Sequence, residues 1–423
     1  MTQTILRDLH LDEAAAAGPG SPNFFNGRLL TGEDLAAEQA AGLAADLELG
    51  RIAGPGVAHG LTVTLLDAGA GSGGVPRIQI GAGAAVTPSG RVLALAAATR
   101  LELRRTPPPQ GALVSAFAQC MPAGPTPAGH AQLHLLTIGP APAEALGRAP
   151  VVSLGDEPAA CAVDRLAAAV RLRLRPFAVP LPPGPAVRLR SFVASLLLGD
   201  LGADEAVLAD EPLLPARGGL LEALRGSCFD TEEIPLAVVR WPSAAAGVEF
   251  VDQWAARRRC VQPGAQGETH MLATDAARAR AEARLSEVQD HLAELVARGT
   301  APTIVARVQF MTLPAAFVLP LRGPTAPTGF DATAFLSGLP VRREAWVEGA
   351  RVGELLAAAA THPAVDVTAA QPEALWRYPI RPRRRPFGAP RHLLLVSGHV
   401  RYAANAQYDL AHYDQANYAV QTI

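Results

Sequence analysis

The sequence contains no lysine, so all 37 of its lysine-plus-arginine residues are arginines. Codon bias in a GC-rich genome accounts for this absence without any change to the fold. The absence still excludes two kinds of chemistry. There is no Walker-type lysine to bind a nucleotide phosphate, and no lysine amine to form a Schiff base with a carbonyl substrate.

Cysteine is also scarce. The four cysteines lie far apart, with no CxxC pair among them: Cys120, Cys161, Cys228 and Cys260. This spacing argues against a zinc knuckle and against a disulfide scaffold, and it predicts reduced, mostly buried thiols.

Long apolar runs and an excess of either charge are missing too. No stretch has the ~20 uncharged apolar residues that a membrane span needs, and acidic residues stand near the N-terminus where a signal peptide needs a basic start. The formal net charge of −2 does not steer the whole chain toward nucleic acid or an anionic membrane. We therefore expect a protein made and assembled in the cytoplasm.

What the sequence does have is apolar residues and turn formers. Hydrophobic residues make up 49% of the 423 residues, which is enough for real cores. At roughly 150 residues per domain, this length predicts two or three domains. The 39 glycines and 37 prolines are dispersed, which favours many turns over long helical bundles.

The first predicted unit covers residues 1–106 and consists of a helix followed by strands. Thr31 and Asp34 have the spacing of a capping box, so a helix is expected from there to Gly50. Strands are expected at 61–66, 77–87 and 90–96, with a turn at Pro88-Ser89-Gly90 joining the last two. The unit ends before the prolines at 107–109, which mark a boundary.

Three further units follow. Residues 111–265 alternate in polarity and predict a β-rich middle domain with short helices. Residues 270–299 predict a long connector helix with a stripe of Leu285, Val288, Leu292 and Leu295, closed by Gly299. Residues 300–423 predict a mixed C-terminal domain with strands at 303–310, 341–347 and 391–400, ending in a Tyr-rich tail. The predicted fold class is therefore α+β, β-rich and multi-domain.

Two patterns resemble ligand sites, and the context favours a structural role for each. The glycines from Gly69 to Gly74 match GxGxxG, but a strand-like segment follows them where a dinucleotide site needs a helix, so a hairpin loop is expected. His130 and His134 have the i, i+4 spacing of metal ligands on a helix, but their segment reads as a strand. We expect no cofactor and no metal.

Catalytic motifs are not evident either. Ala70 stands where GxSxG needs its first glycine, and adjacent acids such as Glu232-Glu233 read as strand-edge solvation. A glycosidase pair built from distant carboxylates stays open. The arginines at 381 and 383–385 favour a solvated loop or an acidic protein partner over nucleic acid.

Aromatic residues gather at both ends of the chain. Phe24 and Phe25 precede the capped helix, where they can belong to a core, staple the helix or dock on a partner. Four of the five tyrosines lie in the tail: Tyr402, Tyr408, Tyr413 and Tyr418. The tail can pack on a neighbouring subunit, fold back on its own domain or remain free, and the sequence does not separate these alternatives.

One ordered set of motifs carries a resemblance to a known family. The segments are FFNGRLLTGEDLAAEQ from Phe24, GPGVAHGLTV from Gly54 and VTPSGRVLAL from Val86, with a weaker match over residues 232–259. Together they resemble proteins encoded with phage-tail-like contractile injection systems, and related baseplate or tail-fibre proteins. Asn26 stands where that family commonly has Asp, and the helix lacks the usual basic end. The resemblance implies a baseplate-peripheral or fibre-attachment role without catalysis, with residues 1–106 as the attachment unit.

The sequence therefore favours a non-catalytic structural component of a contractile injection system, acting through protein–protein contacts within a symmetric assembly. Expected partners are baseplate, sheath or fibre proteins and further copies of this chain, with no nucleic acid and no membrane span. A glycan-binding fibre-like module and a hydrolase with dispersed carboxylates are the alternatives. The residues expected at the partner interface are Phe24, Phe25, Arg28, Leu30, Tyr402, Tyr408, Tyr413 and Tyr418.

Overall fold

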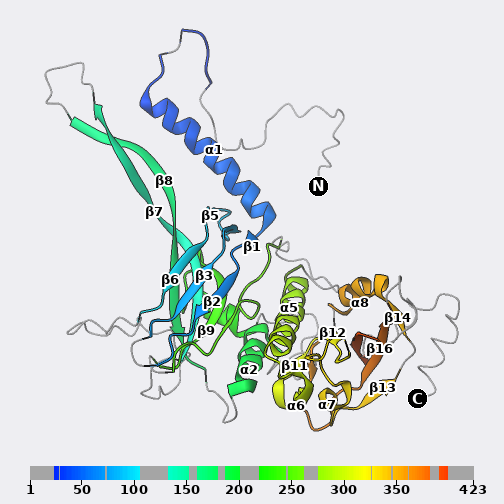
Figure 1. Ribbon diagram of the computed structural model, residues 1–423. Helices are drawn as coiled ribbons and strands as arrows, with labels where there is room; N and C mark the ends of the chain where they lie inside the picture. Colours follow the sequence, from blue (N-terminus) through cyan, green and yellow to red (C-terminus); the bar gives the residue numbers. More distant parts are fainter. Residues whose placement is uncertain are drawn as a thin grey trace, which may run out of the picture.

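The computed structural model describes most of the chain, with several gaps. The described residues are 23–27, 29–71, 74–104, 132–151, 160–179, 186–200, 219–243, 246–261, 275–324, 326–343, 346–360, 362–381 and 390–398. Within them the protein is α+β, β-rich and multi-domain, as the sequence predicts (Figure 1). Arg28, His130, the arginines at 383–385 and the four tail tyrosines lie outside these ranges.

The N-terminal part consists of one helix and two small antiparallel sheets. Helix α1 (Gly32–Ala53) begins at the predicted capping box, in which the Asp34 amide donates to Thr31 Oγ1 and the Asp34 carboxylate accepts from the Thr31 amide. One sheet has the order β1-β4-β5 and the other β2-β3-β6. Their strands are β1 (Gly56–Gly60), β2 (Val63–Asp67), β3 (Arg77–Ile80), β4 (Gly83–Val86), β5 (Val92–Leu95) and β6 (Thr99–Glu102).

The predicted turns are confirmed, but strand β1 was not predicted. The Pro88-Ser89-Gly90 turn joins β4 and β5, and the glycine-rich segment after Gly69 connects β2 to the antiparallel β3 as a hairpin loop. Strand β1 contains two glycines and only one β-branched residue, Val57, so its local sequence favours a turn. Pairing with β4 makes it a strand, and that pairing is not visible in the local sequence.

The middle part is a four-stranded sheet in the order β10-β9-β7-β8. Strands β7 (Leu133–Val151) and β8 (Ala160–Phe177) form a long hairpin, flanked by β9 (Ile234–Arg240) and β10 (Phe250–Asp252). Strand β9 pairs with β7 only over Leu133–Ile138, so the rest of the hairpin continues as a two-stranded ribbon. Figure 1 shows this ribbon extending past the small sheets.

Two cores hold the middle part together. Ile138, Leu236 and Val239 share one buried cluster with Val57 and Ile78, so the small sheets and the middle sheet pack on common apolar surface. The second cluster lies beneath helices α2 (Ala186–Leu198) and α4 (Gly219–Leu224). Burial of these aliphatic side chains supplies the main stabilisation of such a layered arrangement.

Helix α5 (Asp275–Ala297) lies between the β-rich part and the C-terminal part in Figure 1. Its Ala283 belongs to the core under α2, whereas Val288, Leu292 and Leu295 belong to the C-terminal core. The predicted apolar stripe is therefore confirmed, as is Gly299, whose φ of 73° ends the helix in the left-handed region. One helix thus contributes to two cores.

The C-terminal part is a mixed sheet in the order β12-β17-β16-β13, with β14 also pairing with β16. The strands are β12 (Ala316–Pro320), β13 (Val341–Arg343), β14 (Val347–Glu348), β16 (Leu375–Arg381) and β17 (His392–Ser397); β11 (Thr312–Leu313) pairs separately with β15 (Val365–Asp366). Short helices α6 (Ala306–Gln309), α7 (Ala332–Phe335) and α8 (Val352–Ala359), with 3-10 turns at Ala301–Thr303 and Gly349–Arg351, complete it.

The strand predicted at residues 303–310 is wrong. The Gln309 amide donates to the Val305 carbonyl and the Phe310 amide to the Ala306 carbonyl, which makes this segment the helix α6. Its β-branched residues suggested a strand, but burial of Ala306, Gln309 and Phe310 on one side follows helical spacing. The predicted strands at 341–347 and 391–400 correspond to β13, β14 and β17. The domain boundaries drawn from the sequence stay a prediction.

Candidate functional site

The clearest exposed apolar surface lies on α1 and on the segment before it. Phe24 is 48% exposed, Phe25 63%, and Leu30 52%. Leu29, Leu35, Leu43, Leu49 and Ile52 are exposed as well, and Gly50 is the only buried residue of the helix. We call residues 23–27 and 29–53 the N-terminal arm. A run of large exposed apolar side chains is typical of interaction surfaces, so this arm is a candidate contact site.

The arm is anchored to the body at its C-terminal end. A Cβ added to Gly50 would lie 1.9 Å from the carbonyl oxygen of Gly90, so the helix touches the β4–β5 turn directly. Arg51 Nε donates to the Ser89 carbonyl at 3.2 Å beside this contact. Two glycines thus permit a close backbone approach that larger residues would prevent.

The ribbon formed by β7 and β8 is a second exposed apolar surface. Leu146, Val163 and Leu166 are 46%, 49% and 70% exposed. Isolated two-stranded ribbons are marginal in water, so this extension is a second candidate contact surface. Sequence reasoning did not select these residues because it did not foresee how far the ribbon extends beyond β9.

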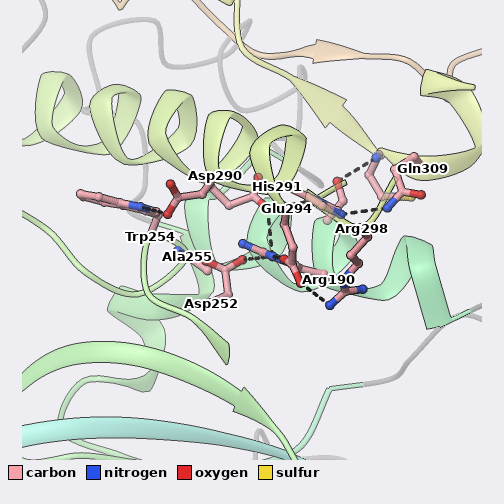
Figure 2. A network of polar contacts seen from close by, with 12 residues as sticks. Arg190, Asp252, Trp254, Ala255, Asp290, His291, Glu294, Arg298 and Gln309 are labelled. Atoms are coloured by element: carbon pink, nitrogen blue, oxygen red, sulfur yellow. Dashed lines mark hydrogen bonds and ion pairs between the residues drawn. The ribbon is translucent and has the colours of Figure 1, made fainter. Parts of the chain in front are cut away.

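A buried cluster of charged groups joins α2, β10 and α5 (Figure 2). Arg190 Nε lies 3.1 Å from Asp252 Oδ2 and 3.7 Å from Glu287 Oε1, and its Nη1 pairs with Glu294. We call Arg190, Asp252, Glu287, His291 and Glu294 the junction cluster. Asp252 and Glu287 are only 1% and 3% exposed. Sequence reasoning missed this cluster, since its members are scattered along the chain.

Burial and charge perturb the titration of the junction cluster. Burial raises the pKa of Glu287 to about 7, although Arg190 opposes the shift, and it raises the pKa of Asp252 as well. Burial, and to a smaller extent the nearby Arg190, lower the pKa of His291 to about 3. Burial alone would lower the pKa of Arg190, but Asp252, Glu287 and Glu294 together raise it. His291 is therefore neutral, with its Nε2 2.8 Å from Gln309 Nε2.

The junction cluster connects α2, β10 and α5. The carboxylates of Asp252 and Glu287 are buried, that of Glu294 is 36% exposed, and Gln309 brings in α6 from the C-terminal part. Helix α2 makes two further hydrogen bonds to this part of the chain. Ser195 Oγ and Thr312 Oγ1 lie 2.7 Å apart, and the Met311 amide donates to Ser191 Oγ at 3.0 Å. These contacts join α2 to the segment that precedes the C-terminal sheet.

Glu233 forms a second buried charge centre and corrects a prediction. It accepts from Thr137 Oγ1 at 2.8 Å and from Arg173 Nη1 at 2.5 Å, and Arg175 lies 3.4 Å away. The expected solvation of the Glu232-Glu233 pair at a strand edge is wrong for Glu233, which is 3% exposed. Arg173 and Arg175, two alternating arginines of β8, face this carboxylate, so Glu233 is held in a partly buried ion pair.

The other motifs of the sequence form no ligand site within the described residues. His134 lies in strand β7, as expected, with its ring 6.0 Å from that of Trp241. No group of three or more His, Cys, Asp or Glu side chains able to hold a metal occurs among the residues described. In the same ranges, no helix is long and apolar enough to cross a membrane.

Known proteins give little guidance for this chain. No family model matches the sequence, and no curated protein matches it. Among solved structures, a crystal structure of TssK matches with 13% identity and a TM-score of 0.21. The match covers 49% of this chain and 52% of that one, so this chain spans about half the length of that protein. A superposition this weak establishes neither a common fold nor a common function.

Proposed function

We propose that this chain is a non-catalytic structural component of a contractile injection system or phage-like tail. It occupies a baseplate-peripheral or fibre-attachment position, assembles in the bacterial cytoplasm, and acts through contacts with baseplate, sheath or fibre proteins and with further copies of itself. The observation that carries the proposal is the N-terminal arm, a 22-residue helix that exposes several leucines along its length and is preceded by exposed aromatic side chains.

The segments that resemble the contractile-system family also support the proposal, because they meet in the fold. The Val57 amide donates to the Arg258 carbonyl at 2.9 Å, and the Cys260 amide donates to the Val57 carbonyl at 3.3 Å. Gly56 has a φ of 142°, and a Cβ there would lie 2.5 Å from the Arg259 carbonyl oxygen. The second matched segment, from Gly54, and the end of the weaker match at 232–259 are therefore in direct backbone contact.

The chemistry of the arm indicates what kind of partner covers it. Besides its leucines, α1 carries one basic residue, Arg51, and the acidic residues Glu33, Asp34, Glu38, Asp46 and Glu48. An apolar groove edged with basic side chains would satisfy both features. Aromatic anchors such as Phe24 and Phe25 are the side chains that contribute most when buried at interfaces.

The buried carboxylates favour a structural role over the hydrolase alternative. Asp252 and Glu287 are the distant acids that the chain brings together, but they are enclosed by α2 and α5 and neutralised by Arg190. A glycosidase pair must flank an accessible sugar ring. This cluster instead connects elements of the fold.

A pull-down with matched variants tests the proposal. The double variant Phe24→Ser/Phe25→Ser should fold normally, because both side chains are exposed, but should lose at least about tenfold in recovery of sheath, tube or baseplate proteins. The control Val308→Ser removes an apolar side chain that is 56% exposed on α6, outside the arm, and should bind like the wild type. Equal recovery by both variants, or recovery of none of these proteins by the wild type, contradicts the proposal.

A further inference from the structure

A cavity of about 720 Å3 lies between α5 and the end of α8. Its charged residues come from α5 and the segment before it: Arg259, Arg278, Glu282 and Arg284. The rest of its lining is apolar and consists mainly of alanines at the start of β12 and along α8, with Leu356 among them. We call this cavity the α5–α8 groove. It combines an apolar surface with basic side chains, which are the two features that complement the N-terminal arm.

The groove has an excess of positive charge, because three arginines and one glutamate line it. Arg259 Nε lies 2.6 Å from Glu282 Oε2, and Arg284 pairs with Asp200. Arg278 is exposed and forms no ion pair with the residues that the structure describes. A carboxylate that enters the groove therefore meets a guanidinium that is available to donate two parallel hydrogen bonds.

Helix α1 carries the complementary pattern on one face. Leu35 and Glu38 are three residues apart, so their side chains lie next to each other on the helix surface, and both are exposed. The helix has an excess of acidic residues, and its one basic residue, Arg51, lies near the anchored end. The half of α1 far from the anchor therefore presents leucine and carboxylate side chains without a basic residue.

The arm does not reach the groove of its own chain. Its anchored end lies beside that groove, because Gly56, shortly after the end of α1, lies against the backbone of Arg259. From there the helix leads away from α5 and α8 (Figure 1). Leu35 lies in the first turn of this 22-residue helix, which is roughly 33 Å long. The outer half of α1 is therefore available to another molecule.

We infer that the arm of one copy binds in the α5–α8 groove of a second copy, with Leu35 packing against the alanine surface and Glu38 pairing with Arg278. The inference deepens the proposed function and rests on it, since it names the chain itself as the partner that covers the outer half of α1. Burial of the leucine supplies the apolar part of the contact, and charge complementarity fixes its orientation.

The two surfaces of this contact are different, so the contact is heterologous. Each copy offers one arm and one groove, and binding through the arm leaves the groove of the same copy open to a further arm. A heterologous contact repeats from copy to copy and closes into a ring where the rotation between neighbours permits it. Each copy then has two neighbours, as a component of a symmetric assembly requires.

Sedimentation of the purified full chain at several concentrations tests the inference with two half-defective variants. The arm variant Leu35→Gln/Glu38→Gln keeps an intact groove, and the groove variant Arg278→Glu/Ala357→Glu keeps an intact arm; all four side chains are exposed. The wild type should form species larger than one copy, and each variant alone should need at least about tenfold higher concentration to associate. An equimolar mixture of the variants should form two-copy species, because an intact arm then meets an intact groove.

The control Arg322→Glu/Ala326→Glu makes the groove variant's two changes on exposed residues outside the groove and should associate like the wild type. A wild type that stays a single copy at every concentration, a groove variant that associates like the wild type, or a mixture without two-copy species overturns the inference. If such a wild type still recovers sheath, tube or baseplate proteins in the pull-down, the proposed function stands without this contact. Recovery of none of these proteins contradicts the proposed function itself.

Discussion

Glu233 is the buried carboxylate that faces the arginines of β8. Replacing it by alanine leaves Arg173 and Thr137 without their acceptor inside the fold. The two arginine side chains stay 28% and 35% exposed, so the loss is smaller than for a fully buried pair; losing a hydrogen bond to a charged group costs about 1.5–3 kcal/mol. We predict that Glu233→Ala lowers the free energy of unfolding by this amount in urea titrations.

The neighbouring residue provides the control for this prediction. Glu232 is half-buried and accepts a hydrogen bond from Ser89 Oγ at 2.5 Å. Glu232→Ala should cost about 1 kcal/mol, the usual value of one hydrogen bond. If the two alanine variants were equally stable, Glu233 would not be the structural centre described here.

The junction cluster predicts a pH-dependent effect of Glu287→Gln. The pKa of Glu287 is raised from 4.5 to about 7 in the fold, so the folded state binds the extra proton and stability falls as pH rises across that window. Glu287→Gln removes the titrating carboxyl group, so the variant does not lose stability in this way as pH rises. Its stability relative to the wild type should therefore increase by roughly 1–3 kcal/mol between pH 4.5 and pH 7.5.

His291 makes the comparison with the wild type necessary. Its pKa falls from 6.5 to about 3 on folding, so its own contribution to stability rises with pH over that range and opposes the contribution of Glu287. The wild-type profile alone can therefore look flat. Urea midpoints of the wild type and of Glu287→Gln across the pH range separate the contribution of Glu287 from that of His291. A stability difference between the two proteins that does not change with pH contradicts the raised pKa of Glu287.

Helix α1 offers a matched pair of glycine substitutions. Gly50→Ala places a methyl group against the Gly90 carbonyl and must push the helix away from the β4–β5 turn, at a cost of about 1–3 kcal/mol. Gly42→Ala meets nothing within 4 Å and should stabilise the helix by about 0.5–1 kcal/mol. Thermal unfolding followed by circular dichroism distinguishes the two. A destabilising Gly42→Ala, or a neutral Gly50→Ala, would disagree with the anchoring contact.

The elements also differ in how far the sequence could predict them. Helices α1 and α5 were predictable, because a capping box, an apolar stripe and a terminal glycine are local signals. Strand β1 and helix α6 were not, since pairing with β4 and burial of Phe310 override their local preference. The junction cluster was least predictable. Its Arg190 contacts reach Asp252 and Glu294, 62 and 104 residues away in the sequence.

On the scale of the whole molecule, the buried and exposed surfaces suggest different roles. The junction cluster and helix α5 connect the β-rich part to the C-terminal part from within. The N-terminal arm and the β7–β8 ribbon leave apolar side chains exposed. Single exposed apolar residues are ordinary, but a patch that runs along a whole helix indicates an interaction site. We therefore expect the isolated chain to be a stable body whose exposed extensions become buried in an assembly.

Leu35 and Leu43 extend this expectation along the arm. Both are half-exposed, at 51% and 53%, and make α1 apolar far from its anchor at Gly50. The double variant Leu35→Gln/Leu43→Gln should keep the urea midpoint of the wild type but shift the native mass of the purified complex toward the lone chain. A large loss of stability in this variant would mean that the helix packs within its own chain instead.

The most direct test of the central claim is purification through a tag on this protein from its native host, followed by native mass measurement and negative-stain imaging. We predict sheathed, tube-containing particles that carry this chain, and their loss from the Phe24→Ser/Phe25→Ser preparation. A monomer without bound proteins in the wild-type preparation would contradict a structural role in a contractile injection system.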